Sequence, residues 1–340
     1  MAQTRLHNIS LALFALACVT TIGIICYILI RDWIWAQNQI KKANEKCKEY
    51  NEQVCKLSIE STSTSTSTST STSTSTSTPR SNTPIAITDG GNVTEGQIAH
   101  QALIQFENPV LSKSFSCEGS LISEHYVLSS AYCITTAGHN PRMRVTLGIM
   151  YSELSQRRVY NVAAFHVHPG YTNQVGFHGL LDDIALLKLD KKVDFDRTMR
   201  PICLNTDYKI EKYRNIVIAS GWDHNNAEVR LRMTQLRLDE DPKSTCGKHL
   251  NKFGGYSEYI ICTLNPGENK SVNFGTNGGG PLQVWSDRCP DGKTPLYELI
   301  GTVENCQTGT ENVTEKTNNY NIGQEHLIYV ASFSSVFSYV

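Results

Sequence analysis

The chain has 340 residues, of which 40% are hydrophobic and 19% are charged, so it can bury at least one full core. Its formal net charge of -1 gives no electrostatic reason to expect nucleic acid or an anionic membrane surface as a partner. Function therefore has to be argued from local sites.

Residues 9–30 form an uncharged run of 22 residues, long enough to cross the roughly 30 Å hydrocarbon layer as a helix. We expect a transmembrane signal-anchor here, with residues 1–8 as a cytoplasmic tail. The alternative is a cleaved signal peptide, for which Ala15-Leu-Ala-Cys18 offers a cleavage site, and a secreted product.

Cysteine usage decides the expected compartment. Of the 11 cysteines, nine follow the apolar run, a pattern typical of an oxidised, extracellular framework. Beyond the apolar run, three Asn-x-Ser/Thr sequons, at Asn92, Asn269 and Asn312, agree with this placement. We therefore expect a type II membrane protein whose carboxy-terminal domain is extracellular and glycosylated.

Residues 31–60 predict a juxtamembrane amphipathic helix. Apolar residues recur at intervals of three and four, at Trp33, Ala36, Ile40, Ala43, Cys47, Tyr50, Val54 and Leu57. Such a seam fits either a short helix without a partner or a homodimeric coiled coil over residues 33–57. Cys47 and Cys55 would lie about 12 Å apart along the helix, too far to bond to each other.

Residues 61–84 begin with nine Ser-Thr dipeptides and continue through Pro79 to Pro84. No apolar residue in this segment offsets the entropic cost of ordering, so it is expected to stay unfolded. An O-glycosylated stalk is the favoured interpretation, and a bare flexible linker is the alternative.

Residues 85–340 change to short apolar stretches of strand length separated by Gly, Pro, Asn and Asp clusters. This pattern of short apolar segments and turn residues predicts an all-β domain or a pair of barrels.

Motifs along this segment occur in a characteristic order. They are Ile87-Thr-Asp-Gly90, Cys117-Glu-Gly-Ser-Leu-Ile-Ser123, Val127-Leu-Ser-Ser-Ala-Tyr-Cys133, His168-Pro-Gly-Tyr171, Asp183-Ile-Ala-Leu-Leu187, Arg200-Pro-Ile-Cys-Leu204, Ser220-Gly-Trp222 and Gly279-Gly-Pro-Leu282. In this order they resemble the trypsin/chymotrypsin-like serine protease family (peptidase S1) over 87–340. The resemblance implies two six-stranded antiparallel Greek-key barrels with a cleft between them and a short carboxy-terminal helix.

Family chemistry needs a hydroxyl nucleophile, an imidazole base and a carboxylate that holds the imidazole. Matched to the family motifs, the base position is Tyr132 and the nucleophile position is Gly278, so only the carboxylate, Asp183, remains. A phenol is a poor base at neutral pH and glycine has no side chain. The expectation is therefore a domain that is not an enzyme, with Asp183 kept as a hydrogen-bonding group at a buried turn.

Further departures concern the loop before Gly278. Thr276 replaces the oxyanion-loop glycine and Asn277 stands where the family has the aspartate that pairs with the freed amino terminus. Phe274 replaces a pocket cysteine, and Val272 occupies the pocket floor, which gives no attraction for a basic side chain.

The resemblance also implies disulfides. Cys117–Cys133 and Cys246–Cys262 match the family's local bridges. Family members with an amino-terminal extension often tie it to the Pro-Ile-Cys-Leu motif, which implies Cys55–Cys203. Proximity in sequence suggests Cys289–Cys306. Cys47 would remain for an interchain bridge in a dimer.

Three functional hypotheses follow. The first is a membrane-tethered, catalytically silent homolog that binds an extracellular protein such as a protease, a zymogen or a serpin-like inhibitor. It is similar to silent relatives in insects that act as cofactors or decoys in extracellular cascades. The others are an active endopeptidase with a displaced triad and an adhesive ectodomain. No cofactor and no metal site is expected.

Overall fold

The structure is a computed structural model of the whole chain. It describes residues 2–64, 91–108, 113–138, 141–148, 158–171, 182–206, 216–223, 230–239, 260–264, 278–292, 294–303 and 328–332. Side chains are described within these ranges except at residues 2–19, 36, 58–64 and a few positions in the strands. The expected carboxy-terminal helix after residue 332 and residues 65–84 of the expected stalk lie outside these ranges.

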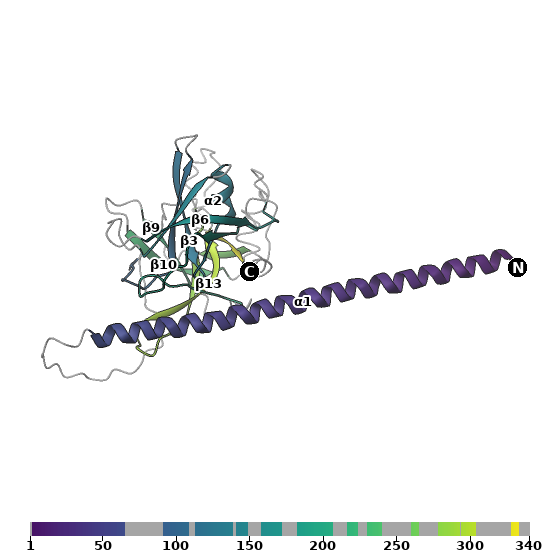
Figure 1. Cartoon of the computed structure of the whole chain (residues 1–340), viewed down its shortest axis with the longest axis horizontal. Coiled ribbons are helices and arrows are strands. Elements are labelled where there is room, and N and C mark those ends of the chain that lie inside the picture. Colours follow the sequence, from purple (N-terminus) through teal and green to yellow (C-terminus); the bar gives the residue numbers. More distant parts are fainter. Residues whose placement is uncertain are drawn as a thin grey trace, which may run out of the picture.

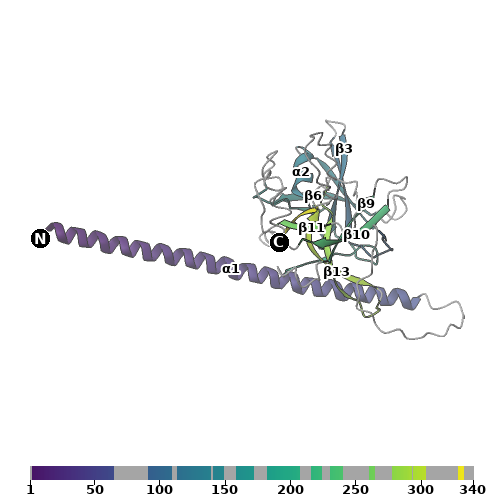
Figure 2. The ribbon, with the colours of Figure 1, turned by 180° about the vertical axis from the view of Figure 1, so that it is seen from behind.

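One long helix precedes a body made of strands. Helix α1 (Ala2–Thr64) is continuous, and its carboxy-terminal part lies along the body near β13 (Pro295–Val303), while its amino-terminal end extends far from it (Figures 1 and 2). The expected separate segments 9–30 and 31–60 are thus parts of one helix. Residues 61–64, expected in the stalk, also belong to it, because each residue added to a formed helix costs little.

The outer part of α1 exposes many apolar side chains. Those between residues 22 and 35 with large exposed areas are Ile22, Ile24, Ile25, Tyr27, Ile28, Leu29, Ile30, Trp33, Ile34 and Trp35. Among the described residues, no helix combines the length and the apolar character that crossing a membrane requires.

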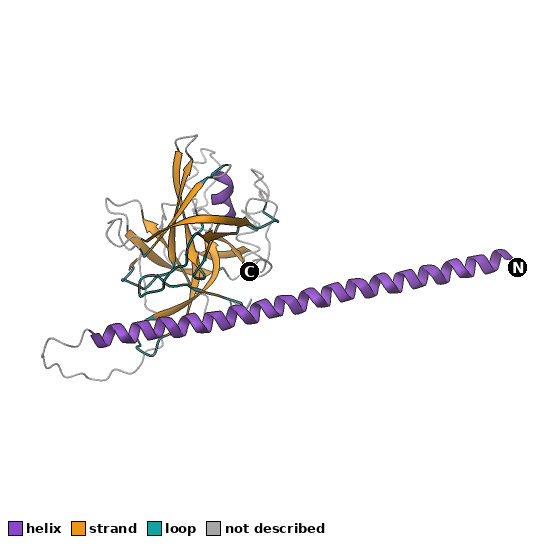
Figure 3. Ribbon diagram, viewed as in Figure 1, coloured by secondary structure: helices purple, strands orange, loops and turns teal. Residues whose placement is uncertain are grey.

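The body begins with a closed antiparallel barrel of six strands, with the order β2-β3-β4-β7-β6-β5. Its strands are β2 (Gln101–Asn108), β3 (Lys113–Leu121), β4 (Tyr126–Ser129), β5 (Arg142–Leu147), β6 (Arg158–Val167) and β7 (Ala185–Leu189). Alternation along β2 buries Ala102, Ile104 and Phe106 on one face. The expected all-β barrel fold is confirmed for this half, and Figure 3 shows how far strands outweigh helices in the body.

The second half is an eight-stranded sheet with the order β1-β10-β11-β14-β13-β12-β9, in which β9 also pairs with β10 and β8 pairs with β13. Besides β13, its strands are β1 (Gly91–Asn92), β8 (Cys203–Leu204), β9 (Ile216–Asp223), β10 (Arg230–Leu238), β11 (Ile260–Leu264), β12 (Pro281–Arg288) and β14 (Ile328–Ser332).

Buried apolar side chains form one cluster inside the barrel, one within the second sheet and one between the two halves. The cluster between the halves joins Leu128 and Leu186 of the barrel to Ile218 and Trp222 of the second sheet. This shared cluster holds the barrel against the second sheet. The boundary between the two halves is called the joint below.

Helix α1 docks on the body through part of the seam predicted from its sequence. Tyr50 is 7% exposed and Val54 is 4% exposed. The Tyr50 ring packs edge-on against Phe195 with centroids 5.5 Å apart, and its hydroxyl donates a hydrogen bond to the Glu124 carboxylate. This part of the seam is therefore covered by the chain's own body, whereas the sequence analysis had left open a helix without a partner or a homodimeric coiled coil.

Two disulfides link α1 to the body, and they differ from the expected pairing. Cys47 bonds to Cys203, and Cys55 bonds to Cys289. The predictions of Cys55–Cys203 and Cys289–Cys306 are wrong, as is the expectation of a free Cys47 for an interchain bridge. The reason is the position of α1 across the body, which places Cys47 beside β8 and brings Cys55 to the end of β12.

Candidate active site

Asp183 lies just before β7 and is 2% exposed. Its Oδ2 accepts a hydrogen bond of 2.6 Å from the Ser130 hydroxyl, and its Oδ1 accepts one of 2.7 Å from the Tyr132 backbone N–H. The preceding residue, Asp182, has a φ of 58°, which marks a tight turn into the strand. The carboxylate thus fastens this turn to the start of α2 (Ala131–Thr136), the structural role expected for it.

Tyr132 occupies the second position of α2 and is half-buried. Its backbone, not its ring, contacts Asp183. The carboxylate therefore orients a peptide N–H and a serine hydroxyl; in a catalytic triad this group also orients an imidazole. Ser130 itself is 1% exposed, so its hydroxyl is closed off from solvent.

Gly278 is buried beside this turn with a φ of 110°. Its carbonyl oxygen accepts a 2.9 Å hydrogen bond from the Glu118 N–H and lies 3.9 Å from the Cys133 sulfur. The structure thus brings together the three positions that the sequence singled out, because Cys133 directly follows Tyr132.

Gly279 is packed still more closely. Its φ is 86°, and a Cβ placed on it would lie 2.3 Å from the Glu118 carbonyl oxygen and 2.4 Å from the Ser129 hydroxyl oxygen. Both values are far inside contact distance, so the loop reaches the barrel only because this residue lacks a side chain. A side chain at this position would therefore disrupt the contact between the loop and the barrel.

A buried polar cluster lies behind the site, and its central residue, Glu118, was assigned no role from the sequence. Glu118 is 1% exposed; its Oε1 accepts a 2.9 Å hydrogen bond from the Trp222 N–H, and its Oε2 accepts a 2.7 Å bond from the Gln101 amide. Ser220 donates a 2.8 Å hydrogen bond to Gln101 Oε1. Strand β3 is thereby tied to β9 across the joint. The sequence signal for it was a carboxylate between Cys117 and Gly119 within a predicted strand.

His100 lies nearby but is no substitute for the missing base. Full burial lowers its pKa to about 3, and the positive charge of Arg200 acts in the same direction. Burial also lowers the pKa of Arg200 to about 10, so Arg200 stays charged at neutral pH. The imidazole is thus neutral and sealed from any substrate.

Several predicted site residues lie outside the described residues. They are the loop and pocket positions Val272, Phe274, Thr276 and Asn277, the sequons at Asn269 and Asn312, and Cys246 and Cys306. Asn92 and Cys262 lie in β1 and β11, but their side chains are not described. The predicted Cys117–Cys133 disulfide is present and ties β3 to α2 beside the site.

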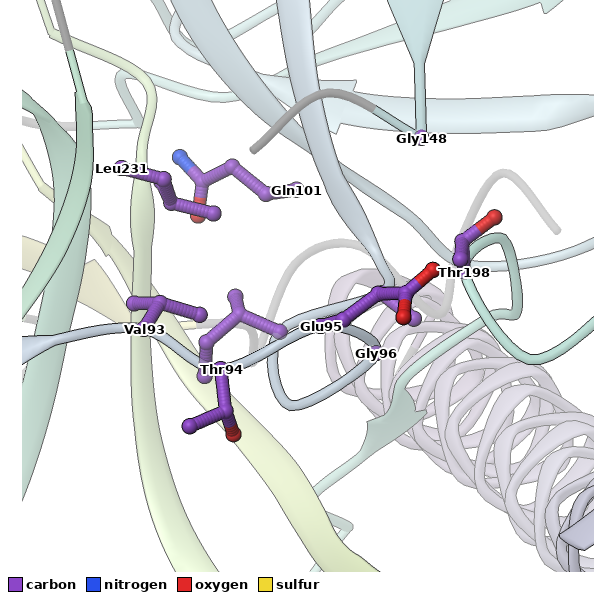
Figure 4. A pocket seen from close by; sticks show the side chains of 10 residues that line it. Val93, Thr94, Glu95, Gly96, Gln101, Gly148, Thr198 and Leu231 are labelled. Carbon is purple, nitrogen blue, oxygen red and sulfur yellow. The ribbon is translucent and has the colours of Figure 1, made fainter. Parts of the chain in front are cut away.

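A small cavity of about 20 Å³ lies at the joint, lined by residues that include Val93, Thr94, Gly96 and Leu231 (Figure 4). It has room for about one water molecule. Gly96 has a φ of 74°, and a Cβ on it would lie 2.6 Å from the Arg197 carbonyl oxygen, so this corner requires glycine. The cavity is too small to hold a substrate.

Comparison with known proteins matches these residues to one family. The model of the family described as Trypsin matches residues 87–321. Similar curated proteins include Serine protease Hayan of Drosophila melanogaster, 25% identical over 69% of this chain and 38% of its own length. Phenoloxidase-activating factor 3 of Holotrichia diomphalia is 29% identical over 58% of this chain and 62% of its own length.

Among solved structures, one titled "Structure of GrC" superposes with a TM-score of 0.51 at 20% identity, covering 73% of this chain and 95% of that one. This likeness supports the fold alone. The chain spans between 38% and 62% of the length of the first three curated relatives it matches.

Proposed function

The chain belongs to the trypsin family, and because Tyr132 and Gly278 stand at the positions of the family's base and nucleophile, we propose that it is a non-catalytic member that binds an extracellular protein. The observation that carries this proposal is the identity of these two residues: a phenol stands where the family has an imidazole, and residue 278 has no side chain that could attack a carbonyl. Loss of a complete triad costs about 10⁶ in turnover, roughly 8 kcal/mol of barrier.

The alternative of a displaced triad has one candidate nucleophile beside Asp183, the Ser130 hydroxyl. Its burial argues against attack on a substrate, since a nucleophile must reach the scissile carbonyl. This burial favours the non-catalytic proposal.

The proposed partner is a protease, its zymogen or a serpin-like inhibitor. Support comes from the family membership and from relatives whose names mark them as serine proteases or a phenoloxidase-activating factor. A domain that keeps the protease shape without its chemistry presents a surface that such partners already recognise in active members. The half-buried Tyr132 ring would serve as an anchor, because tyrosine is enriched at interface hot spots.

The proposed placement is extracellular, with the second sheet forming the family's second barrel. Three disulfides support the compartment, since such bonds persist in oxidising environments. Pairing of β9 with both β10 and β12 supports the barrel. We retain the tether through residues 9–30 as part of the proposal; the exposed apolar side chains from Ile22 to Ile30 support it. Alkaline extraction of cell membranes would release the protein if this tether is wrong.

The binding proposal is tested with a panel made of an inhibitor-blocked trypsin-like protease, its zymogen and a serpin. Binding of at least one panel protein is expected, and Tyr132→Ala should weaken it by about tenfold or more, a hot-spot effect. Phe165→Ala is the matched control, because Phe165 is an aromatic residue 39% exposed on β6, and it should change affinity less than twofold. Failure of every panel protein to bind, or equal affinity of the two variants, would count against the proposal.

A further inference from the structure

A groove of about 260 Å³ lies between α1 and the body, away from the degenerate triad. The body supplies Ile122, Tyr126, Leu186, Ile202 and Leu204, and α1 supplies residues that include Lys42, Ala43 and Lys46. The family match begins at residue 87, so one wall of this groove comes from a segment outside the matched region.

The floor of the groove is apolar. Leu186 is 5% exposed and Ile202 is 4% exposed, and both belong to the core cluster between the two halves. Ile122, Tyr126 and Leu204 pack against the same cluster and are only partly buried. An alkyl chain laid on this floor would extend the existing core and remove apolar surface from water.

The rim on the α1 side is basic. Lys42 and Lys46 are four residues apart and therefore lie on the same face of the helix. Lys46 Nζ is 2.7 Å from a Glu49 carboxylate oxygen, so that charge is already compensated. Lys42 is exposed and has no ion pair among the described residues. A positive charge thus borders an apolar floor.

The walls are held in place by covalent bonds. Cys47 lines the groove and bonds to Cys203 beneath it, and Cys55 bonds to Cys289 about two turns further along α1. A site whose walls do not have to be ordered on binding loses less affinity to conformational entropy. The groove is therefore preformed.

We propose that this groove binds a medium-chain carboxylate, with the alkyl chain on the apolar floor and the carboxylate at Lys42. The size agrees: by the measure on which the 20 Å³ cavity holds about one water molecule, 260 Å³ holds about thirteen, which is enough for the roughly ten non-hydrogen atoms of octanoate. A cationic amphiphile would meet Lys42 with like charge. This site is independent of the proposed protein-binding function.

The test is a titration of the full chain with octanoate labelled with carbon-13 at the carboxylate, followed by NMR. Saturable binding is expected in the wild type. Lys42→Glu should weaken it about three- to tenfold, the range for an exposed ion pair that is replaced by repulsion. Ala43→Trp, which fills the groove from a helix surface position, should abolish it.

Lys41→Glu is the matched control, since Lys41 is exposed on the same helix turn but does not line the groove, and it should change the affinity less than twofold. Circular dichroism and thermal midpoints establish that each variant is folded. The proposal is overturned if octanoate does not saturate, if Ala43→Trp binds as the wild type does, or if octyltrimethylammonium binds as tightly as octanoate.

Discussion

Restoring the two missing catalytic side chains should not restore catalysis. The double substitution Tyr132→His and Gly278→Ser places an imidazole and a hydroxyl at the family positions. Residue 278 has a φ of 110°, a backbone conformation that residues with a Cβ rarely adopt, and it is buried. The new serine is therefore expected to distort the loop and not to align with the imidazole.

The substitution at residue 278 also carries a structural cost. Holding a residue with a Cβ at positive φ costs on the order of 1–3 kcal/mol. A buried hydroxyl that lacks a partner adds about 1–3 kcal/mol. The double variant should thus lose roughly 2–6 kcal/mol of unfolding free energy, which lowers the thermal midpoint by roughly 4–24 °C for a domain of this size.

Thermal denaturation and hydrolysis of a peptide amide library measure the two consequences. The matched control is Gly292→Ser, since Gly292 has a φ of 70° but a Cβ placed there would have no atom within 4 Å, so only the backbone strain applies. The reasoning is refuted if the double variant cleaves peptides above the wild-type background. It is equally refuted if Gly278→Ser destabilises no more than Gly292→Ser.

Three further predictions concern the body and its helix. Tyr50→Phe should lower the free energy of unfolding by about 1 kcal/mol, because it removes the hydroxyl that donates a hydrogen bond to Glu124 and lowers the pKa of that carboxyl. The difference between wild type and variant is present above the ordinary glutamate pKa and should vanish as the pH falls through the folded pKa of Glu124. Unfolding of both proteins measured over an acid pH series would check this. His100 has a folded pKa of about 3 against an ordinary 6.5, so the unfolded state binds more protons between these values and the free energy of unfolding should fall on acidification, by at most about 1.4 kcal/mol per pH unit. Denaturant titrations at several pH values should show that this free energy depends less steeply on pH in His100→Gln than in the wild type. An equal dependence on pH in the two proteins would exclude His100 as the cause. Cys55→Ser removes the bond to Cys289 and should lower the free energy of unfolding by about 2–4 kcal/mol. After cleavage at Arg80, α1 of this variant should stay attached to the body through the Cys47–Cys203 bond. Release of α1 on a non-reducing gel would contradict the observed pairing.

The strand-rich body and its degenerate site could be predicted because their signals are local. The motifs around Tyr132, Asp183 and Gly278 identified three residues that the structure brings together. The role of Glu118 could not be predicted in this way, because its partners Gln101 and Trp222 come from other strands. A charged residue in a core strand indicates a buried polar contact without saying which groups provide it.

For helix α1, the sequence predicted the apolar face but not the surface that covers it. The spacing of Cys47, Tyr50 and Val54 correctly predicted an apolar face, and the distance argument correctly kept Cys47 from pairing with Cys55. Periodicity describes one face of one helix and does not say what covers it. The position of α1 along the body depends on long-range packing, and this is why Cys55 was assigned to the wrong partner and Cys47 was left for an interchain bridge.

The most direct test of a non-catalytic site is intact-mass spectrometry of the full chain after exposure to a fluorophosphonate, with trypsin treated in parallel. Trypsin should gain one adduct, and this protein should keep its unmodified mass, because Ser130 is buried and residue 278 has no hydroxyl. A stoichiometric adduct on any serine near Asp183 would contradict the proposal that this domain binds without cleaving.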